Sequence, residues 1–148
     1  MTVVEAIHFG AALLALGLGL AVVLLGKGTA RHRWMGRAWV AGMAAVNGAA
    51  LLSYEDGQPG IFHVLALLSL TTLIMGIRTI RARKVEDHAM WMAWTYAGLL
   101  AAGAGQLAVL IGLSQNAVYA AIALTIAVAY WINNIREMPI AAAKRLRG

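Results

Sequence analysis

The sequence of 148 residues contains no cysteine and few charged residues. Without cysteine the chain cannot form disulfides, thiolate metal sites, iron–sulfur clusters or cysteine nucleophiles, so histidine is left as the main ligand for a transition metal. Charged residues make up only 12% of the chain and hydrophobic residues 61%, whereas about a quarter of a typical soluble domain is charged. This composition excludes an ordinary soluble domain and predicts a membrane protein.

Five apolar runs occupy most of the chain, and each approaches the ~20 residues that a helix needs to cross ~30 Å of hydrocarbon. We therefore expect an all-α integral membrane protein with five transmembrane helices. Short loops make consecutive helices antiparallel neighbours, so the first four should form an up-down four-helix bundle of two hairpins. Residues 1–113 are expected to form this histidine-bearing bundle, and residues 114–148 the fifth helix and a basic cytoplasmic tail. The runs are 3–26, 34–54, 61–80, 90–113 and 117–135.

Twelve basic and six acidic residues give a formal net charge of +6. The basic residues follow the first, third and fifth apolar runs, so all of them share one side of the membrane if the chain alternates at each crossing. The positive-inside rule then places the C-terminus in the cytoplasm and the N-terminus outside a bacterial plasma membrane. Membrane topology and attraction to anionic lipid account for these charges, and we expect no nucleic-acid partner.

A weak internal repeat relates the two halves of the predicted bundle. His8 precedes His32 by 24 residues, and His63 precedes His88 by 25. The second member of each pair opens a stretch rich in Met and Trp, HRWMGRAW in one case and HAMWMAW in the other. Two hairpins of the same orientation would be related by an axis along the membrane normal. Chance is the alternative, because Trp and Met are common at membrane interfaces.

The four histidines are the residues with the strongest functional signal. Each lies near the start of a separate apolar run, where ionisable groups are uncommon and usually functional. The predicted topology places His8 and His63 near the outer surface, and His32 and His88 near the inner surface. The members of each pair belong to diagonal helices, so they can face each other across the bundle axis. Two imidazoles in that arrangement suit the axial ligation of haem iron.

Neighbouring residues favour the inner pair. Arg33 and Arg37 are available to bind haem propionates, because guanidinium groups bind carboxylates in two-point geometry, whereas the outer end has no Lys or Arg. Gly36 follows His32 by one turn and leaves room beside it. A row of small residues also follows His8 along the first helix, and it indicates either space for a flat macrocycle or close helix packing. The row is Ala12, Ala15 and Gly19.

The rest of the sequence offers little other chemistry. Asn47 and Gln106 are the amides expected deep in the bundle, where an interhelical hydrogen bond is the favoured interpretation and a quinone contact the alternative. The bilayer centre contains no Asp, Glu, Lys, Arg or His, which disfavours an ion pore or a proton wire. No Ser-His-Asp, HExxH or paired-carboxylate arrangement is present. The sequence leaves open whether the protein is an enzyme.

Two resemblances bear on function. The HRWMGR run that begins at His32, the later run opened by His63 and the HAMW run that begins at His88 resemble an uncharacterised bacterial membrane-protein family, DUF2306, over about residues 5–110. The layout of histidines on diagonal helices is similar to that of the cytochrome b561 group of di-haem membrane proteins. The second resemblance implies haem b and transmembrane electron transfer. The chain departs from that group because each of its histidines lies on a separate helix.

These observations predict a protein that binds one or two b-type haems and transfers electrons in the membrane. His32 and His88 are the favoured ligands, followed by His8 and His63. The partners are then the lipid bilayer and either a quinone or another membrane protein. The rival hypothesis is a non-catalytic accessory or assembly subunit of a larger membrane complex. Its histidines would contact a partner, a pigment, or a metal such as copper or zinc, and it could also lack a cofactor.

Overall fold

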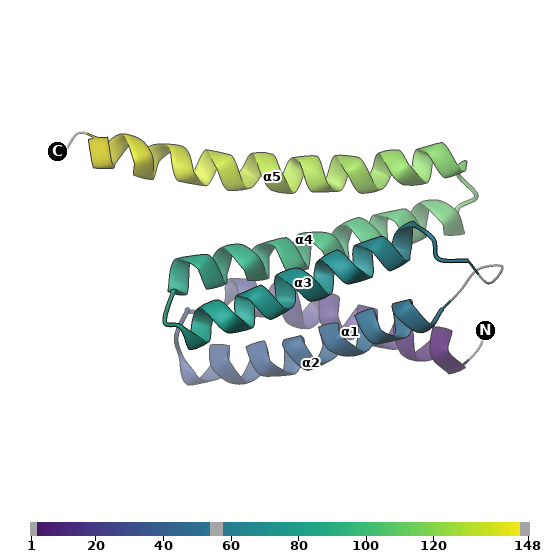
Figure 1. The fold of residues 1–148 in the computed structure, drawn as a ribbon, viewed down its shortest axis with the longest axis horizontal. Coiled ribbons are helices and arrows are strands. Elements are labelled where there is room, and N and C mark those ends of the chain that lie inside the picture. Colours follow the sequence, from purple (N-terminus) through teal and green to yellow (C-terminus); the bar gives the residue numbers. More distant parts are fainter. Residues whose placement is uncertain (1–2, 54–57, 146–148) are drawn as a thin grey trace. The chain divides into compact units, whose positions relative to one another are not determined.

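The computed structural model describes residues 3–53 and 58–145, with side chains described as far as Tyr130. This part of the chain forms five α-helices and no extended sheet (Figure 1). The all-helical prediction is therefore confirmed. The helices are α1 (Val3–Leu24), α2 (Ala30–Leu52), α3 (Ile61–Arg81), α4 (Val85–Leu110) and α5 (Gln115–Arg145).

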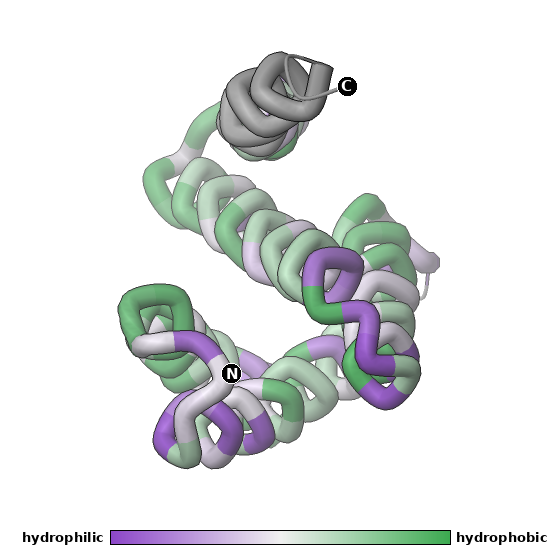
Figure 2. The backbone as a smooth tube through the Cα atoms, turned by 90° about the vertical axis from the view of Figure 1, so that its left-hand side faces the viewer, coloured by the Kyte–Doolittle hydropathy of each residue, from purple (hydrophilic) through white to green (hydrophobic). Residues whose placement is uncertain are grey.

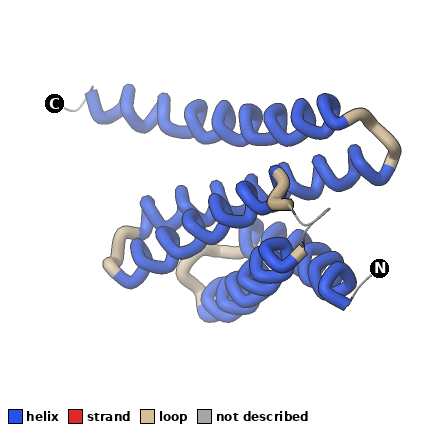
Figure 3. Tube along the Cα trace, turned by 45° about the vertical axis from the view of Figure 1, so that its right-hand side comes forward, coloured by secondary structure: helices blue, strands red, loops and turns tan. Residues whose placement is uncertain are grey.

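Short connections join α1 to α2, α3 to α4 and α4 to α5 (Figure 3). Two helices begin earlier than hydropathy suggests, because polar residues form their first turns. Thr29 caps α2 by accepting a hydrogen bond from the amide of His32 at 3.1 Å, and Glu86 and Asp87 lie in the first turn of α4, where negative charge is favourable. The segments between the apolar runs, at residues 27–33 and 81–89, are thus partly helical. Hydropathy alone does not detect such capping residues.

Within the part of the chain that the structure describes, three helices are long and apolar enough to cross a membrane: α1, α3 and α4. Four polar residues near its start make α2 less apolar than these three. In α5 the apolar part with described side chains is Gln115–Tyr130, which is shorter than a full span. The five-span topology therefore stays a prediction. The basic tail side chains lie outside the described residues.

Internal packing divides the chain into two units, Met1–Leu99 and Leu100–Gly148. The division at residue 113 that we expected from hydropathy stays a prediction. Within the first unit, the α1–α2 and α3–α4 connections lie at one end, and the starts of α1 and α3 lie at the other (Figure 1). Figure 2 shows the hydrophilic segments at helix ends and the apolar segments between them. His32 and His88 follow the two connections, so both belong to the same end of this unit.

The core of the first unit draws on all of its helices. Its buried members are Ala15, Trp39, Met43, Val46, Leu73 and Leu99. Many large apolar side chains on α1, α3 and α4 are instead exposed, among them Ile7, Leu14, Leu67 and Leu68. In a bilayer such side chains contact lipid at no cost, so the small core is consistent with a membrane protein.

Interhelical hydrogen bonds of polar side chains join each helix of the first unit to the next, from α1 through α4 and back to α1. The α1–α2 contact has Trp39 Nε1 donating to the Ala15 carbonyl at 3.0 Å, and the α2–α3 contact has Asn47 Nδ2 donating to Ser69 Oγ at 3.1 Å. Between α3 and α4, Thr95 Oγ1 donates to Thr72 Oγ1 at 2.8 Å. Tyr96 on α4 donates to the Leu16 carbonyl of α1 at 3.2 Å. Each bond gives a polar group a partner where lipid offers none.

Candidate functional site

The imidazole of His88 is held by the helix next to it. His88 lies in the first turn of α4, and its Nδ1 is 2.8 Å from the carbonyl oxygen of Gly76 on α3. A carbonyl oxygen can only accept a hydrogen bond, so Nδ1 carries the proton. In the neutral ring Nε2 then keeps its lone pair. A histidine held in this way by a backbone carbonyl is ready to bind a metal through its other nitrogen.

His32 lies at the same end of the unit, in the first turn of α2. Its Nδ1 is buried and has no hydrogen-bond partner. Burial lowers the pKa of the imidazole below its usual value, and the positive charge of Lys27 lowers the pKa further, while the Val22 carbonyl opposes the shift. The positive form of His88 also lowers the pKa of His32. These effects favour the neutral form of His32, which is the form that binds a metal.

The outer pair is arranged differently. His8 lies in the second turn of α1, and its Nδ1 is 3.1 Å from the carbonyl oxygen of Val46 on α2, so its Nε2 also keeps a lone pair. In His63, by contrast, Nδ1 accepts a hydrogen bond from the amide of Gly60 at 3.1 Å, as part of the cap of α3. The neutral ring of His63 then carries its proton on Nε2. That tautomer donates hydrogen bonds and does not ligate through Nε2.

These hydrogen bonds follow the internal repeat only in part. The rings of His32 and His88, which correspond in the repeat, each interact with a carbonyl of the preceding helix, Val22 and Gly76 respectively. The other corresponding pair differs, because Nδ1 of His8 lies against the Val46 carbonyl whereas Nδ1 of His63 accepts from the amide of Gly60. Sequence spacing alone could not have distinguished the four rings.

The row of small residues on α1 is packed against aromatic rings. Ala15 is fully buried, and a Cβ added to Gly19 would lie 2.6 Å from Cδ2 of Tyr96 and 2.8 Å from Nε1 of Trp39. Trp39 and Tyr96 contact each other edge to face, with ring centroids 6.3 Å apart. Of the two interpretations of this row, close helix packing is the one that the structure shows at Gly19. Room for a macrocycle must come from elsewhere.

Space is present one turn above His32. A Cβ added to Gly36 would meet no atom within 4 Å, so the helix surface there is open. The two arginines nearby are exposed: Arg33 donates to the carbonyl of Gly28, and the Arg37 guanidinium lies 5.4 Å from the ring centroid of Trp34. Both remain at the inner end of α2. The predicted inner-site residues on this helix thus occupy consecutive turns beside an open surface.

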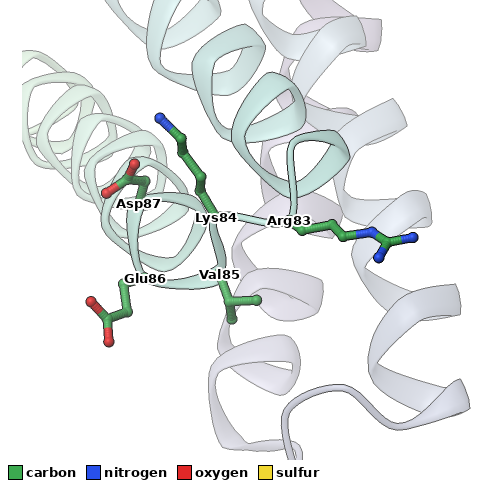
Figure 4. A pocket seen from close by; sticks show the side chains of 5 residues that line it. All are labelled: Arg83, Lys84, Val85, Glu86 and Asp87. Carbon is green, nitrogen blue, oxygen red and sulfur yellow. The ribbon is translucent and has the colours of Figure 1, made fainter.

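A hollow of about 420 Å³ lies at the α3–α4 connection, lined by residues 83–87 (Figure 4). Arg83 and Lys84 extend away from each other, and Glu86 and Asp87 extend from the first turn of α4. Arg83 adopts a left-handed conformation with φ of 61°, which lets the chain reverse direction between the helices. The hollow is lined mainly by charged groups, so it does not offer an apolar slot for a porphyrin.

The donor set limits which cofactor could bind. Among residues with described placements, no group of three or more His, Asp or Glu side chains is positioned to hold a metal ion. Protein zinc sites use three or four protein ligands, so two imidazoles are too few. Haem iron takes four ligands from its porphyrin and needs only axial ligands from the protein. Two histidines are enough for that requirement in number, and His32 and His88 begin α2 and α4 at the same end of the unit.

Sequence reasoning found one polar core contact and missed others. Asn47 is buried and bonds to Ser69 on α3, as expected for a deep amide. Gln106 is exposed and belongs to the second unit, and an interhelical bond for it stays a prediction. Trp39, Thr95 and Tyr96 also form interhelical hydrogen bonds. Trp and Tyr read as interface anchors in a sequence. No spacing in the sequence marks them, because the acceptors of Trp39 and Tyr96 are carbonyls on another helix.

Five helices, a core linked by polar contacts and extensive exposed apolar surface define an all-helical membrane protein with histidines at its helix starts. A family model described as a predicted membrane protein, DUF2306, matches residues 5–141, and the chain belongs to that family. The match extends through most of α5, beyond the region of the resemblance seen in the sequence. No curated protein and no solved structure matches the chain.

Proposed function

We propose that this protein binds b-type haem through His32 and His88 and acts in transmembrane electron transfer. The observation that supports the proposal is the state of the two rings: His32 has a buried Nδ1 without a partner, and His88 has its Nδ1–H committed to the Gly76 carbonyl. Each imidazole thus has one nitrogen with an unused lone pair, and imidazole ligates metals through either nitrogen. Haem bound there would supply one-electron chemistry between the ferric and ferrous states.

The proposal includes an up-down bundle in which α2 and α4 are diagonal partners. Hydrogen bonds between α1 and α2, α2 and α3, α3 and α4, and α4 and α1 support that order, because each joins helices that would be neighbours. Five spans in a bacterial plasma membrane, with the C-terminus in the cytoplasm, complete the arrangement. The two ligands would then lie near the cytoplasmic surface.

Residues around the inner pair have distinct roles in this proposal. Gly36 leaves the space that a porphyrin edge requires. Arg33 and Arg37 would pair with the propionates, and both are exposed at the correct end of α2. The neutral state of His32, maintained by burial and by Lys27, keeps its lone pair available at neutral pH.

One haem per chain is expected, bound at the inner end. The bond from Gly60 to Nδ1 of His63 disfavours ligation by the outer pair, so His8 and His63 are the weaker candidates. Electrons would be exchanged at the inner end with a quinone or with another membrane protein. The exposed α2 surface beside Gly36 gives such a partner access to the proposed site.

The visible spectrum of the purified protein tests the proposal. A Soret band and reduced α and β bands should be present in the wild type and absent from His32→Ala and His88→Ala. The matched controls are His8→Ala and His63→Ala, which should keep the spectrum. Circular dichroism and gel filtration verify folding of each variant, and a haem assay should give one haem per chain.

Three results would overturn the proposal. A colourless wild type that is folded and contains no haem would favour the non-catalytic accessory subunit. A haem spectrum abolished by His8→Ala or His63→Ala, and retained in both inner variants, would move the ligands to the outer end. Copper or zinc found in stoichiometric amount without haem would also contradict it.

A further inference from the structure

The contact between α3 and α4 at Gly76 is closer than side chains normally allow. Gly76 is buried. Its carbonyl oxygen accepts a hydrogen bond from Nδ1–H of His88 at 2.8 Å and another from the Thr79 hydroxyl at 3.0 Å. Thr79 belongs to α3 itself, so only the bond from His88 crosses between the helices, and that bond requires α4 to lie close to α3 at Gly76. Small residues at an interface permit such an approach.

The missing side chain at Gly76 is what makes room for α4. A Cβ added there would overlap the Cε atom of Met92 and would lie 3.3 Å from Cβ of Trp91. Met92 packs against the buried core, so turning its methyl group away loses packing contacts. The Cβ of Trp91 is attached directly to the backbone of α4, so it can yield only if the helix itself moves. A methyl group at position 76 therefore displaces the end of the Met92 side chain and requires α4 to yield by a few tenths of an ångström at Trp91, and a larger side chain requires more.

His88 lies one turn before Met92 on α4, so the same displacement acts on its ring. We propose that Gly76 is a positioning residue for His88: its lack of a side chain lets α4 approach until the Gly76 carbonyl fixes the Nδ1–H tautomer and leaves Nε2 as the ligand atom. This inference rests on the proposed function for the role of Nε2, but the tautomer itself is a property of the chain without cofactor. Backbone acceptors of this kind orient histidine ligands and set their basicity.

The tautomer of His88 can be measured in the apoprotein by long-range ¹H–¹⁵N correlation spectra of histidine-labelled protein in detergent, with assignment by the His88→Ala variant. In the wild type, His88 should show a protonated Nδ1 and an unprotonated Nε2. Gly76→Ala should give a mixture of tautomers, and Gly76→Val a larger loss of the Nδ1–H form. Gly98→Ala is the matched control on α4, because a Cβ at Gly98 meets nothing within 4 Å, and it should leave the spectrum unchanged.

A second-site variant keeps the test decisive if Gly76→Val fails to fold. Met92→Ala removes the methyl group that a Cβ at position 76 would overlap, so the double variant Gly76→Ala, Met92→Ala should recover most of the Nδ1–H form. Met92→Ala alone should retain it. A general loss of packing would instead be worse in the double variant than in either single one, and that result would overturn the proposal. A wild-type His88 protonated at Nε2 would overturn it at once.

Haem reconstitution separates this inference from the proposed function. Gly76→Ala should weaken haem binding by about 10- to 100-fold, the range typical for loss of a partner that orients a ligand, and the double variant should regain affinity. If the wild type binds no haem but the tautomer responds as expected, the proposed function fails and the positioning role of Gly76 stands. If the wild type binds haem but the Gly76 variants change neither the tautomer of His88 nor the affinity for haem, the positioning role is wrong and the proposed function stands.

Discussion

The packing at Gly19 offers a sharp test of how the first unit is built. A Cβ at this position would lie 2.6 Å from Cδ2 of Tyr96 and 2.8 Å from Nε1 of Trp39, distances that Cβ atoms do not adopt in folded proteins. Both obstructing atoms belong to rigid rings. Each ring is also tethered to α1, through the Ala15 carbonyl for Trp39 and the Leu16 carbonyl for Tyr96. Neither ring can turn aside without breaking its hydrogen bond.

The expected cost of Gly19→Ala follows from these contacts. Overpacking a well-packed core costs about 1–3 kcal/mol, and two interhelical hydrogen bonds in a membrane add about 1 kcal/mol at ~0.6 kcal/mol each. Alanine returns about 0.5–1 kcal/mol because it favours the helix over glycine. The net effect should be a loss of about 1–3 kcal/mol in the free energy of unfolding.

Gly17 is the matched control on the same helix. A Cβ added to Gly17 meets nothing within 4 Å, so Gly17→Ala should gain only the helix preference of about 0.5–1 kcal/mol. Reversible unfolding in mixed detergent micelles, followed by circular dichroism, gives the free energy of unfolding for both variants. Equal values for Gly17→Ala and Gly19→Ala would refute the packing argument.

Three further changes test other contacts. Asn47→Ala removes the hydrogen bond to Ser69 and should lower the free energy of unfolding by about 0.6–2 kcal/mol. A free energy of unfolding above that of the wild type would show that this bond does not stabilise the fold. Trp39→Phe keeps most of the ring but loses the indole N–H, so unfolding in micelles should become easier by about 0.6 kcal/mol; an unchanged value would show that the bond is not used. Lys27→Ala should raise the pKa of His32, because a positive charge that lowers it is removed, and an NMR titration of the apoprotein measures this. The pKa of His32 is lower in the folded protein than in the unfolded chain. Its contribution to stability is therefore present above the unfolded pKa of about 6.5 and is lost as the pH falls through the folded pKa. If the part of the stability due to His32 rose on acidification, the lowered pKa would be contradicted.

Hydropathy was sufficient to predict the five helices, because membrane helices must be long and apolar whatever their neighbours are. It was less successful at their starts, where Thr29 and the acidic residues before His88 extend α2 and α4 into segments that look like loops. Hydropathy averages over a turn or more, whereas a cap depends on one side chain. The same averaging favoured α2 as a span although its first turns carry three arginines.

The site was predictable in its residue types but not in its chemistry. Sequence position indicated four histidines near helix starts and favoured the inner pair for its arginines. Which ring nitrogen of each histidine is available depends on acceptors far away in the chain, such as Gly76 for His88 and Val46 for His8. Gly60 determines the state of His63 only because the chain turns there into α3. No spacing rule encodes these partners.

Four of the interhelical hydrogen bonds end on main-chain carbonyls, those made by His8, Trp39, His88 and Tyr96. An acceptor of this kind is present whatever amino acid occupies the position, so mutation cannot delete it. Substitutions should therefore be tolerated differently on the two sides of each bond. At the accepting positions many residues are compatible with the bond, provided that their side chains are small enough for the donor to reach the carbonyl. At the four donor positions, by contrast, most substitutions remove the bond. In saturation mutagenesis, most substitutions at the four donor residues should therefore impair the protein. At the accepting positions, the effect of a substitution should depend only on the size of the new side chain.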